Sequence, residues 1–240
     1  MSEKRQFIWS VIEVILPWVV LLFLAFYTVG FFIYLPYAGF HFGTNVVSRV
    51  YSHPNGLQPG DTLLRIGEVT ADSIDRDLSK GYFENLKAGQ TVDIAVSRQG
   101  SQIVFPYTLP GISAEEVFGR LSSQWFIPYI FWLAGTAALL FLRPRSLTRL
   151  LLALFCYLTA AWLAPSNLSD KHFWNAALAL RSAVWLSAPV YLHLHWLFPT
   201  PLRRLPVGIW STLYVVCGTL AVFSWLQWVP QGTYLTDVTQ

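Results

Sequence analysis

Five long apolar runs constrain the fold of this 240-residue chain more than any other feature. A helix needs roughly 20 mostly apolar residues to cross about 30 Å of hydrocarbon. Lipid offers no hydrogen-bond partner to the backbone, so each run is predicted to be a transmembrane helix. Charged residues make up only 12% of the chain, about half the share that is usual in a soluble domain. The predicted spans lie within Phe7–Tyr34 and at about Trp125–Leu142, Leu147–Ala164, Phe173–Phe198 and Leu205–Val229.

The first run follows Lys4 and Arg5, as the apolar core of a secretory signal peptide would. The run is too long for a signal peptide, however, and no small-residue cleavage site follows it. We therefore predict a membrane anchor. Glu13 is expected near the inner headgroups, where its carboxylate stays hydrated.

Basic residues are distributed unevenly among the N-terminus, the short segments that connect the runs and the C-terminal tail. Alternate segments carry seven of them, whereas the short connection 165–172 has only Lys171 and the C-terminal tail has none. Because cytoplasmic loops are enriched in Lys and Arg, the N-terminus is predicted to be cytoplasmic in a multi-pass cell-membrane protein. Residues from about 36 to 123 and the tail after Val229 are then outside. The seven basic residues are Lys4, Arg5, Arg143, Arg145, Arg149, Arg203 and Arg204.

Charge and cysteine content exclude some classes of protein. The formal net charge is only +3, too small to suggest a nucleic-acid partner. Cys156 and Cys217 both fall inside apolar runs, so the sequence predicts small core residues rather than a disulfide framework.

Between the first two runs the composition becomes that of an ordinary globular domain. Short β-rich segments alternate with turn signals. One helix is predicted at about Ser73–Leu86, capped by Asp72 or Ser73. About 75 residues make a small but viable domain. The predicted strands are Thr44–Tyr51, Thr62–Ile66, Thr91–Ser97 and Gln102–Tyr107, preceded by one that begins at His41.

Three segments of this domain carry a resemblance to a known family. Residues 56–67 read GLQPGDTLLRIG, which resembles the PDZ pattern "GLxPGDxLLxIxG". After the predicted helix, residues 89–92 (GQTV) resemble the "PGxxV" of the family, and residues 96–100 (VSRQG) resemble its "VxRxG". The segments occur in the order of the family, so the resemblance implies a PDZ-like small β-barrel.

The predicted fold is thus an α-helical membrane bundle of about five transmembrane helices with an inserted extracytoplasmic PDZ-like domain. Its parts are a cytoplasmic N-terminus with the first helix (1–35), the PDZ-like domain (36–112), a linker (113–123), helices two to five (124–230) and an extracytoplasmic tail (231–240).

The resemblance also implies a ligand. PDZ domains bind extended peptides, usually C-termini, as an added strand, and the backbone amides of a Gly-containing loop hold the carboxylate. Only one glycine is present in the matching loop, Tyr37–Phe40, so a structural domain that binds no peptide stays an alternative. The implied peptide-binding residues are Ala38, Gly39, Phe40, His41, Phe42, Ile74 and Leu78.

No motif for catalysis, a metal or a cofactor emerges. His193 and His195 are two residues apart, which places their rings on nearly opposite faces of a helix, and no HExxH, GxSxG or P-loop pattern occurs. A membrane-embedded hydrolase is therefore disfavoured. Three polar residues stand inside the predicted fourth span. Arg181 either faces other helices or snorkels toward the outer headgroups, whereas His193 and His195 are expected to pack near its inner end.

Residues 191–199 read YLHLHWLFP, which resembles the "HxxxxFP" end of a helix in the multi-span sensor regions of some bacterial histidine kinases. Receptor kinases of the quorum-sensing type also place a PDZ-like domain outside, after the first span. This chain contains no phosphoacceptor-His helix and no ATP-binding glycine boxes. Either it is the input part of a longer protein, or the kinase hypothesis is wrong.

The sequence therefore predicts a signal-input module that senses a peptide or a protein C-terminus and relays it through a helical bundle in the lipid bilayer. The alternative is a membrane adaptor that recruits peptide segments for a protease or secretion machine. A homodimer is left open.

Overall fold

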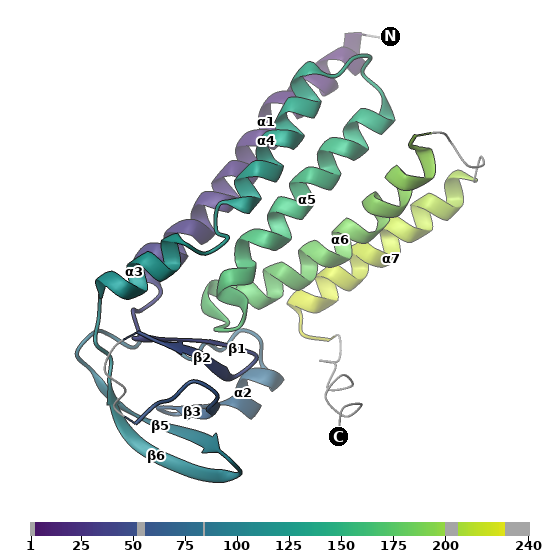
Figure 1. Cartoon of the computed structure of the whole chain (residues 1–240). Coiled ribbons are helices and arrows are strands. Elements are labelled where there is room, and N and C mark those ends of the chain that lie inside the picture. The colour runs from purple at the N-terminus through teal and green to yellow at the C-terminus, as the bar shows by residue number, and fades with distance from the viewer. Residues whose placement is uncertain (1–2, 52–55, 84, 200–205, 229–240) are drawn as a thin grey trace. The chain divides into compact units, whose positions relative to one another are not determined.

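The computed structural model describes residues 3–51, 56–83, 85–199 and 206–228. These residues form seven α-helices and six strands, grouped in two compact units (Figure 1). The helical unit comprises Met1–Val29, Gln124–Ser166 and Ala179–Leu226, and the sheet unit comprises Gly30–Ser123, Asn167–Leu178 and Gln227–Gln240. In chain order the elements are α1 (Glu3–Val29), the π-helical turn η1 (Gly30–Tyr34), β1 (Phe40–Gly43), β2 (Val46–Val50), β3 (Thr62–Ile66), β4 (Val69–Thr70), α2 (Ala71–Arg76), β5 (Thr91–Arg98), β6 (Ser101–Thr108), α3 (Ala114–Leu121), α4 (Ile127–Phe141), α5 (Leu147–Ser169), the 3-10 turn η2 (Phe173–Asn175), α6 (Ala176–Leu197) and α7 (Val207–Trp225).

Three helical segments among the described residues are long and apolar enough to cross a membrane: Val11–Tyr34, Leu147–Ser169 and Val207–Trp225. A fourth apolar helix, Ile127–Phe141, is shorter. These lengths are consistent with a membrane protein. The total of about five spans stays a prediction. Both predicted ends of the last span, Leu205 and Val229, and the tail 231–240 lie outside the described residues.

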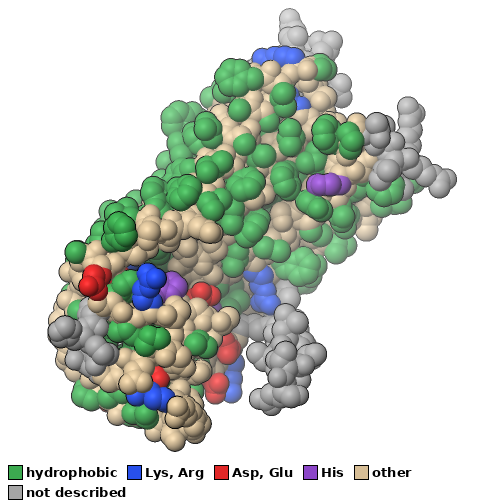
Figure 2. Space-filling view, in the orientation of Figure 1, with side chains coloured by type: hydrophobic (Ala, Val, Ile, Leu, Met, Phe, Trp, Pro, Cys, Tyr) green, Lys and Arg blue, Asp and Glu red, His purple; other side chains and the backbone are tan. Residues whose placement is uncertain are grey.

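Large apolar side chains are exposed along the candidate spans, and Figure 2 shows them spread over the helices. On α1, Trp18 is 62% exposed and Leu22 68%. On α7, Val215 is 66% exposed. Contiguous apolar surface of this extent is costly in water and marks contact with lipid or with another protein.

Within the helical unit, α1 and α4 lie side by side (Figure 1). The indole Nε1 of Trp132 donates to the Pro17 carbonyl at 2.8 Å, and the hydroxyls of Thr28 and Tyr129 are 2.7 Å apart. Gly135 brings α4 close to α5, because a Cβ there would lie only 3.0 Å from the Tyr157 ring.

Glu13 lies in an ion cluster within this unit. Its carboxylate accepts from Arg145 at 2.9 and 2.6 Å and from Arg149 at 2.6 Å, and Arg143 lies 3.8 Å away. The residue is only 9% exposed, so the expectation of a hydrated carboxylate is wrong. The segment that joins α4 to α5 supplies guanidinium donors in place of water.

The six strands of the sheet unit form one antiparallel sheet in the order β1-β2-β3-β5-β6, with β4 paired to β3. The sheet is open, with β1 and β6 at its two ends, whereas the sequence predicted a small barrel. Gln99 and Gly100, both with positive φ, form the tight turn between β5 and β6. The predicted segments agree with β1, β2, β3, β5 and β6 to within two residues at the ends that were predicted.

The helix of this unit is shorter than predicted. α2 covers only Ala71–Arg76, and its N-cap is Thr70 rather than Asp72 or Ser73. The described residues between Asp77 and Leu86 are not helical. The Asp77 side chain accepts from both the backbone amide and the hydroxyl of Ser79, and this local turn competes with helix continuation.

An ion pair joins two of the motif segments. Both carboxylate oxygens of Asp61 accept from Arg98, at 2.7 Å each, and Arg98 also donates to the Gly56 carbonyl. Asp61 is 1% exposed, and the Arg98 guanidinium, aided by the Gln58 amide, lowers the pKa of its carboxyl. The pair holds the turn before β3 against the end of β5.

Candidate binding site

The structure buries most of the residues that the sequence assigned to a peptide groove. Ala38, Gly39, Phe40, Phe42 and Ile74 are buried, His41 is exposed, and Leu78 is half-buried in the turn after α2. Phe40 and Phe42 face an aromatic core with Tyr82, Phe83 and Tyr107.

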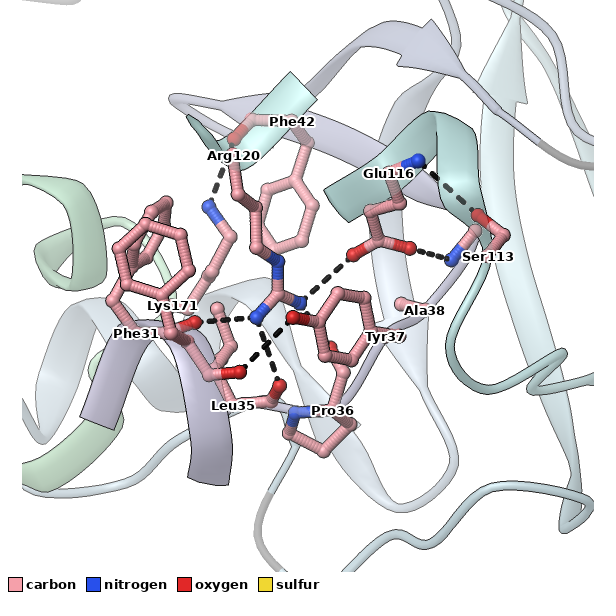
Figure 3. A network of polar contacts seen from close by, with 12 residues as sticks. Phe31, Leu35, Pro36, Tyr37, Ala38, Phe42, Ser113, Glu116, Arg120 and Lys171 are labelled. Carbon is pink, nitrogen blue, oxygen red and sulfur yellow. Dashed lines mark hydrogen bonds and ion pairs between the residues drawn. The ribbon is translucent and has the colours of Figure 1, made fainter. Parts of the chain in front are cut away.

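The predicted carboxylate-binding loop contains one glycine, Gly39. Its backbone amide already binds a carboxylate, which comes from a side chain of this same protein. The amide of Gly39 donates to Glu116 Oε2 at 2.8 Å (Figure 3). Gly39 has φ of +79°, a conformation that side chains with a Cβ rarely adopt. The loop can therefore present its amide to an anion, as the resemblance implies, but α3 supplies that anion.

Arg120 completes the network around Glu116. Its guanidinium donates to Glu116 Oε1 at 2.8 Å and to the carbonyls of Phe31, Leu35 and Pro36 (Figure 3). It also stacks on Tyr37, with the guanidinium carbon 3.8 Å from the ring centroid. Both charged residues are at least 94% buried. The pair fastens α3 to the chain that leaves η1.

The local sequence explains why α3 forms within the predicted linker 113–123. The Ser113 hydroxyl accepts from the amide of Glu116, and this Ser-x-x-Glu spacing is that of a capping box. Arg120 follows Glu116 by four residues, the spacing of a helical ion pair. Both signals are present in the sequence, at Ser113–Glu116 and Glu116–Arg120.

Lys171 joins Asp61, Glu116 and Arg120 as a buried charge among the described residues of the sheet unit. It follows α5 and is only 6% exposed. Its Nζ lies 3.5 Å from the Phe42 carbonyl and 4.9 Å from the centre of the Phe42 ring (Figure 3). Burial lowers the pKa of Lys171 to about 8, although the Asp170 carboxylate acts in the opposite direction. The segment 167–171, called the Lys171 segment below, thus lies against β1, the end strand of the sheet, at Phe42.

A cavity of about 310 Å³ opens beside this network. Its floor and walls come from β1, β2, α3 and the segments 31–38 and 167–171, all in the sheet unit. His41, Arg49, Glu116, Arg120 and Lys171 reach it. Desolvation of the His41 ring by the cavity walls, together with the charges of Lys171 and Arg49, lowers the pKa of this imidazole to about 4. The imidazole is therefore neutral near pH 7.

The three residues that the sequence places in the predicted fourth span, Arg181, His193 and His195, do not form a cluster. Arg181 lies in the second turn of α6 and is half-buried. His193 stacks on Trp210 and its Nδ1 lies 3.2 Å from the Tyr214 hydroxyl, whereas His195 Nδ1 lies 2.9 Å from the Tyr191 carbonyl. Across the described part of the chain, no group of three or more His, Cys, Asp or Glu could hold a metal ion.

Comparisons with known proteins leave the family open. No family model, no curated protein and no solved structure matches this chain.

Proposed function

We propose that this chain is a membrane signal-input module. A PDZ-like extracytoplasmic domain, the sheet unit, senses a peptide or protein C-terminus and relays binding to the membrane helices. The module would serve as the N-terminal sensor part of a histidine kinase, with the lipid bilayer as its second partner.

The observation that carries this proposal is the composition of the sheet unit. It contains residues 30–123, which begin with η1 at the end of the first helix, and also the last residues of α5 and the first residues of α6. The domain is therefore built partly from the ends of three helices, two of which are candidate spans. A ligand that changes this unit acts directly on those helix ends.

The Glu116–Arg120 pair suggests how binding would be relayed. A ligand carboxylate at the Gly39 amide must displace Glu116, which is then separated from Arg120. Arg120 is the residue that holds the carbonyls of Phe31 and Leu35 at the exit of the first helix. A ligand can shift the unit only by the difference between its affinities for the two arrangements.

Peptide binding to the full chain in lipid nanodiscs tests this proposal. We expect peptides with a free C-terminus to bind and their C-terminal amides to bind more weakly. Hydrogen exchange should slow along residues 39–43 and change at residues 167–178. Gly39→Val should abolish peptide binding while β3 and β5 stay protected, because valine disfavours the positive φ at this position.

A broad library of free-carboxylate peptides that leaves exchange at residues 39–43 unchanged would contradict peptide sensing. Binding that leaves residues 167–178 unchanged would favour the adaptor instead, since an adaptor recruits without relaying. The reading frame after residue 240 also distinguishes the sensor from the adaptor. A further span followed by kinase motifs would support the sensor.

A further inference from the structure

Lys171 has more hydrogen-bond donors than the described part of the sheet unit uses. An ammonium group carries three N–H donors. Among the described residues, the only hydrogen bond of Lys171 Nζ is the 3.5 Å contact to the Phe42 carbonyl, at the outer limit of such a bond. By contrast, Arg120 donates to four oxygens in the same region. A buried ammonium with unengaged donors is costly unless a further acceptor binds it.

The cavity in front of Lys171 has an excess of positive charge. Among the described residues that line it, the cations are Arg49, Arg120 and Lys171, and the only carboxylate is that of Glu116. Both Glu116 oxygens are already bound, to Arg120 and to the Gly39 amide. The net charge of these four groups is +2, so the cavity favours an anion.

The remaining walls and the size of the cavity restrict what this anion can be. Phe31, Leu35, Phe40 and Phe83 supply apolar surface. A cavity of about 150 Å³ is enough to bind benzene, and this cavity has about 310 Å³. The space therefore accommodates a ligand of roughly ten non-hydrogen atoms, and not a folded partner.

We propose, independently of peptide sensing, that this cavity binds a small organic acid, with its carboxylate on Lys171 and Arg49 and its apolar body against the phenylalanine rings. The carboxylate supplies the acceptors that Lys171 lacks, in a charge-assisted hydrogen bond. The ligand bridges β2, Phe31 and the Lys171 segment, so it stabilises the sheet unit as well as occupying it.

Calorimetric titration of the full chain in nanodiscs with hexanoate tests the assignment, with empty nanodiscs to subtract partitioning into lipid. Hexanoate should bind saturably with a Kd of about 1 mM or tighter. Hexanamide, which has nearly the same shape but no charge, should bind at least about tenfold more weakly. Equal binding of hexanoate and hexanamide, or no saturable hexanoate binding, would overturn the proposal.

Three variants test whether hexanoate binds in this cavity. Lys171→Met keeps an apolar stem and removes the charge, and should weaken hexanoate binding at least about tenfold. Lys87→Met removes one charge from an exposed site outside the cavity and should leave binding unchanged. Arg49→Gln, at an exposed position of β2, should weaken binding about threefold or more and provides the test if Lys171→Met does not fold. A folded Lys171→Met or Arg49→Gln variant with wild-type affinity would overturn the assignment.

A peptide C-terminus carries the same chemical group, so the source of the carboxylate must be distinguished. The tripeptide acetyl-Ala-Val-Val, with a free carboxylate, is titrated under the same conditions. Hexanoate binding that depends on Lys171 supports the small acid whatever the tripeptide does. Tripeptide binding without hexanoate binding contradicts it.

Discussion

The two units of the molecule each bury a carboxylate against guanidinium donors, but the two clusters differ in how many arginines reach the carboxylate. In the helical unit, Glu13 binds Arg145 and Arg149, and Arg149 also donates to the carbonyls of Leu139 and Leu142. In the sheet unit, Glu116 binds one arginine, while Lys171 lies nearby and makes one long hydrogen bond through its Nζ to the described residues. The first arrangement is that of a structural clamp, and the second leaves capacity for a ligand.

The comparison predicts that the helical clamp is the more costly to break. Glu13→Ala leaves Arg149, whose side chain is 2% exposed, without its carboxylate. Removing one partner of a buried ion pair costs about 3–5 kcal/mol. We expect that loss in the free energy of unfolding in detergent, measured by denaturant titration. The exposed Glu68→Ala is the control and should change it by less than about 0.5 kcal/mol. Equal effects would show that the cluster does not stabilise the fold.

Glu116→Ala should have a smaller effect. Arg120 keeps its three carbonyl acceptors in this variant, so the loss is that of one charged hydrogen bond and the Gly39 contact, about 2–3 kcal/mol. Hydrogen exchange of the β3 and β5 amides measures it. Glu115→Ala, one residue away on the exposed face of α3, is the matched control. An effect of Glu116→Ala no larger than that of Glu115→Ala would contradict the role of the pair.

We expect Lys171 to make the stability of the sheet unit depend on pH in the alkaline range. Its folded pKa is about 8, below the ordinary value of 10.5, so between these values the unfolded chain binds more protons. Stability of the sheet unit should therefore rise with pH over this window, by at most about 1.4 kcal/mol per pH unit. Lys171→Met should remove this rise. A difference between wild type and Lys171→Met that does not vary from pH 8 to 10.5 would contradict the assignment.

The smallest predicted effect tests a neutral contact of the same unit. The Tyr82 hydroxyl donates to Asn45 Oδ1 at 2.8 Å. Tyr82→Phe keeps the ring against Phe42 and loses only this bond, about 1 kcal/mol. Hydrogen exchange of the β3 amides again measures the change. A loss above that of Glu116→Ala would invert the ranking of charged and neutral contacts.

The sequence predicted the parts of the fold that depend on local pattern. Apolar length indicated the long helices, and β3 begins and ends at the predicted residues, Thr62 and Ile66. The helix after residue 73 was overestimated because apolar spacing does not register the turn that the Asp77 side chain forms.

The charged groups of the candidate site were missed for a different reason. Glu116 and Arg120 lie in a segment interpreted as a linker, and Lys171 lies in a short connection counted only for membrane topology. Their proximity arises from tertiary packing between segments more than 70 residues apart, as the Gly39–Glu116 bond illustrates. Only the capping box at Ser113 and the four-residue spacing of the pair were visible in advance.

The basic residues of the short segments predict that Ser101 lies outside the cell and Ser146 on the cytoplasmic side. Single cysteines at Ser101, in the sheet unit, and Ser146, next to the clamp, are introduced with Cys156 and Cys217 replaced by alanine. Intact cells are treated with an impermeant thiol reagent. In intact cells we expect labelling of Ser101→Cys and none of Ser146→Cys. We expect Ser146→Cys to be labelled only after the cells are lysed. Labelling of Ser146→Cys but not of Ser101→Cys in intact cells would contradict this prediction.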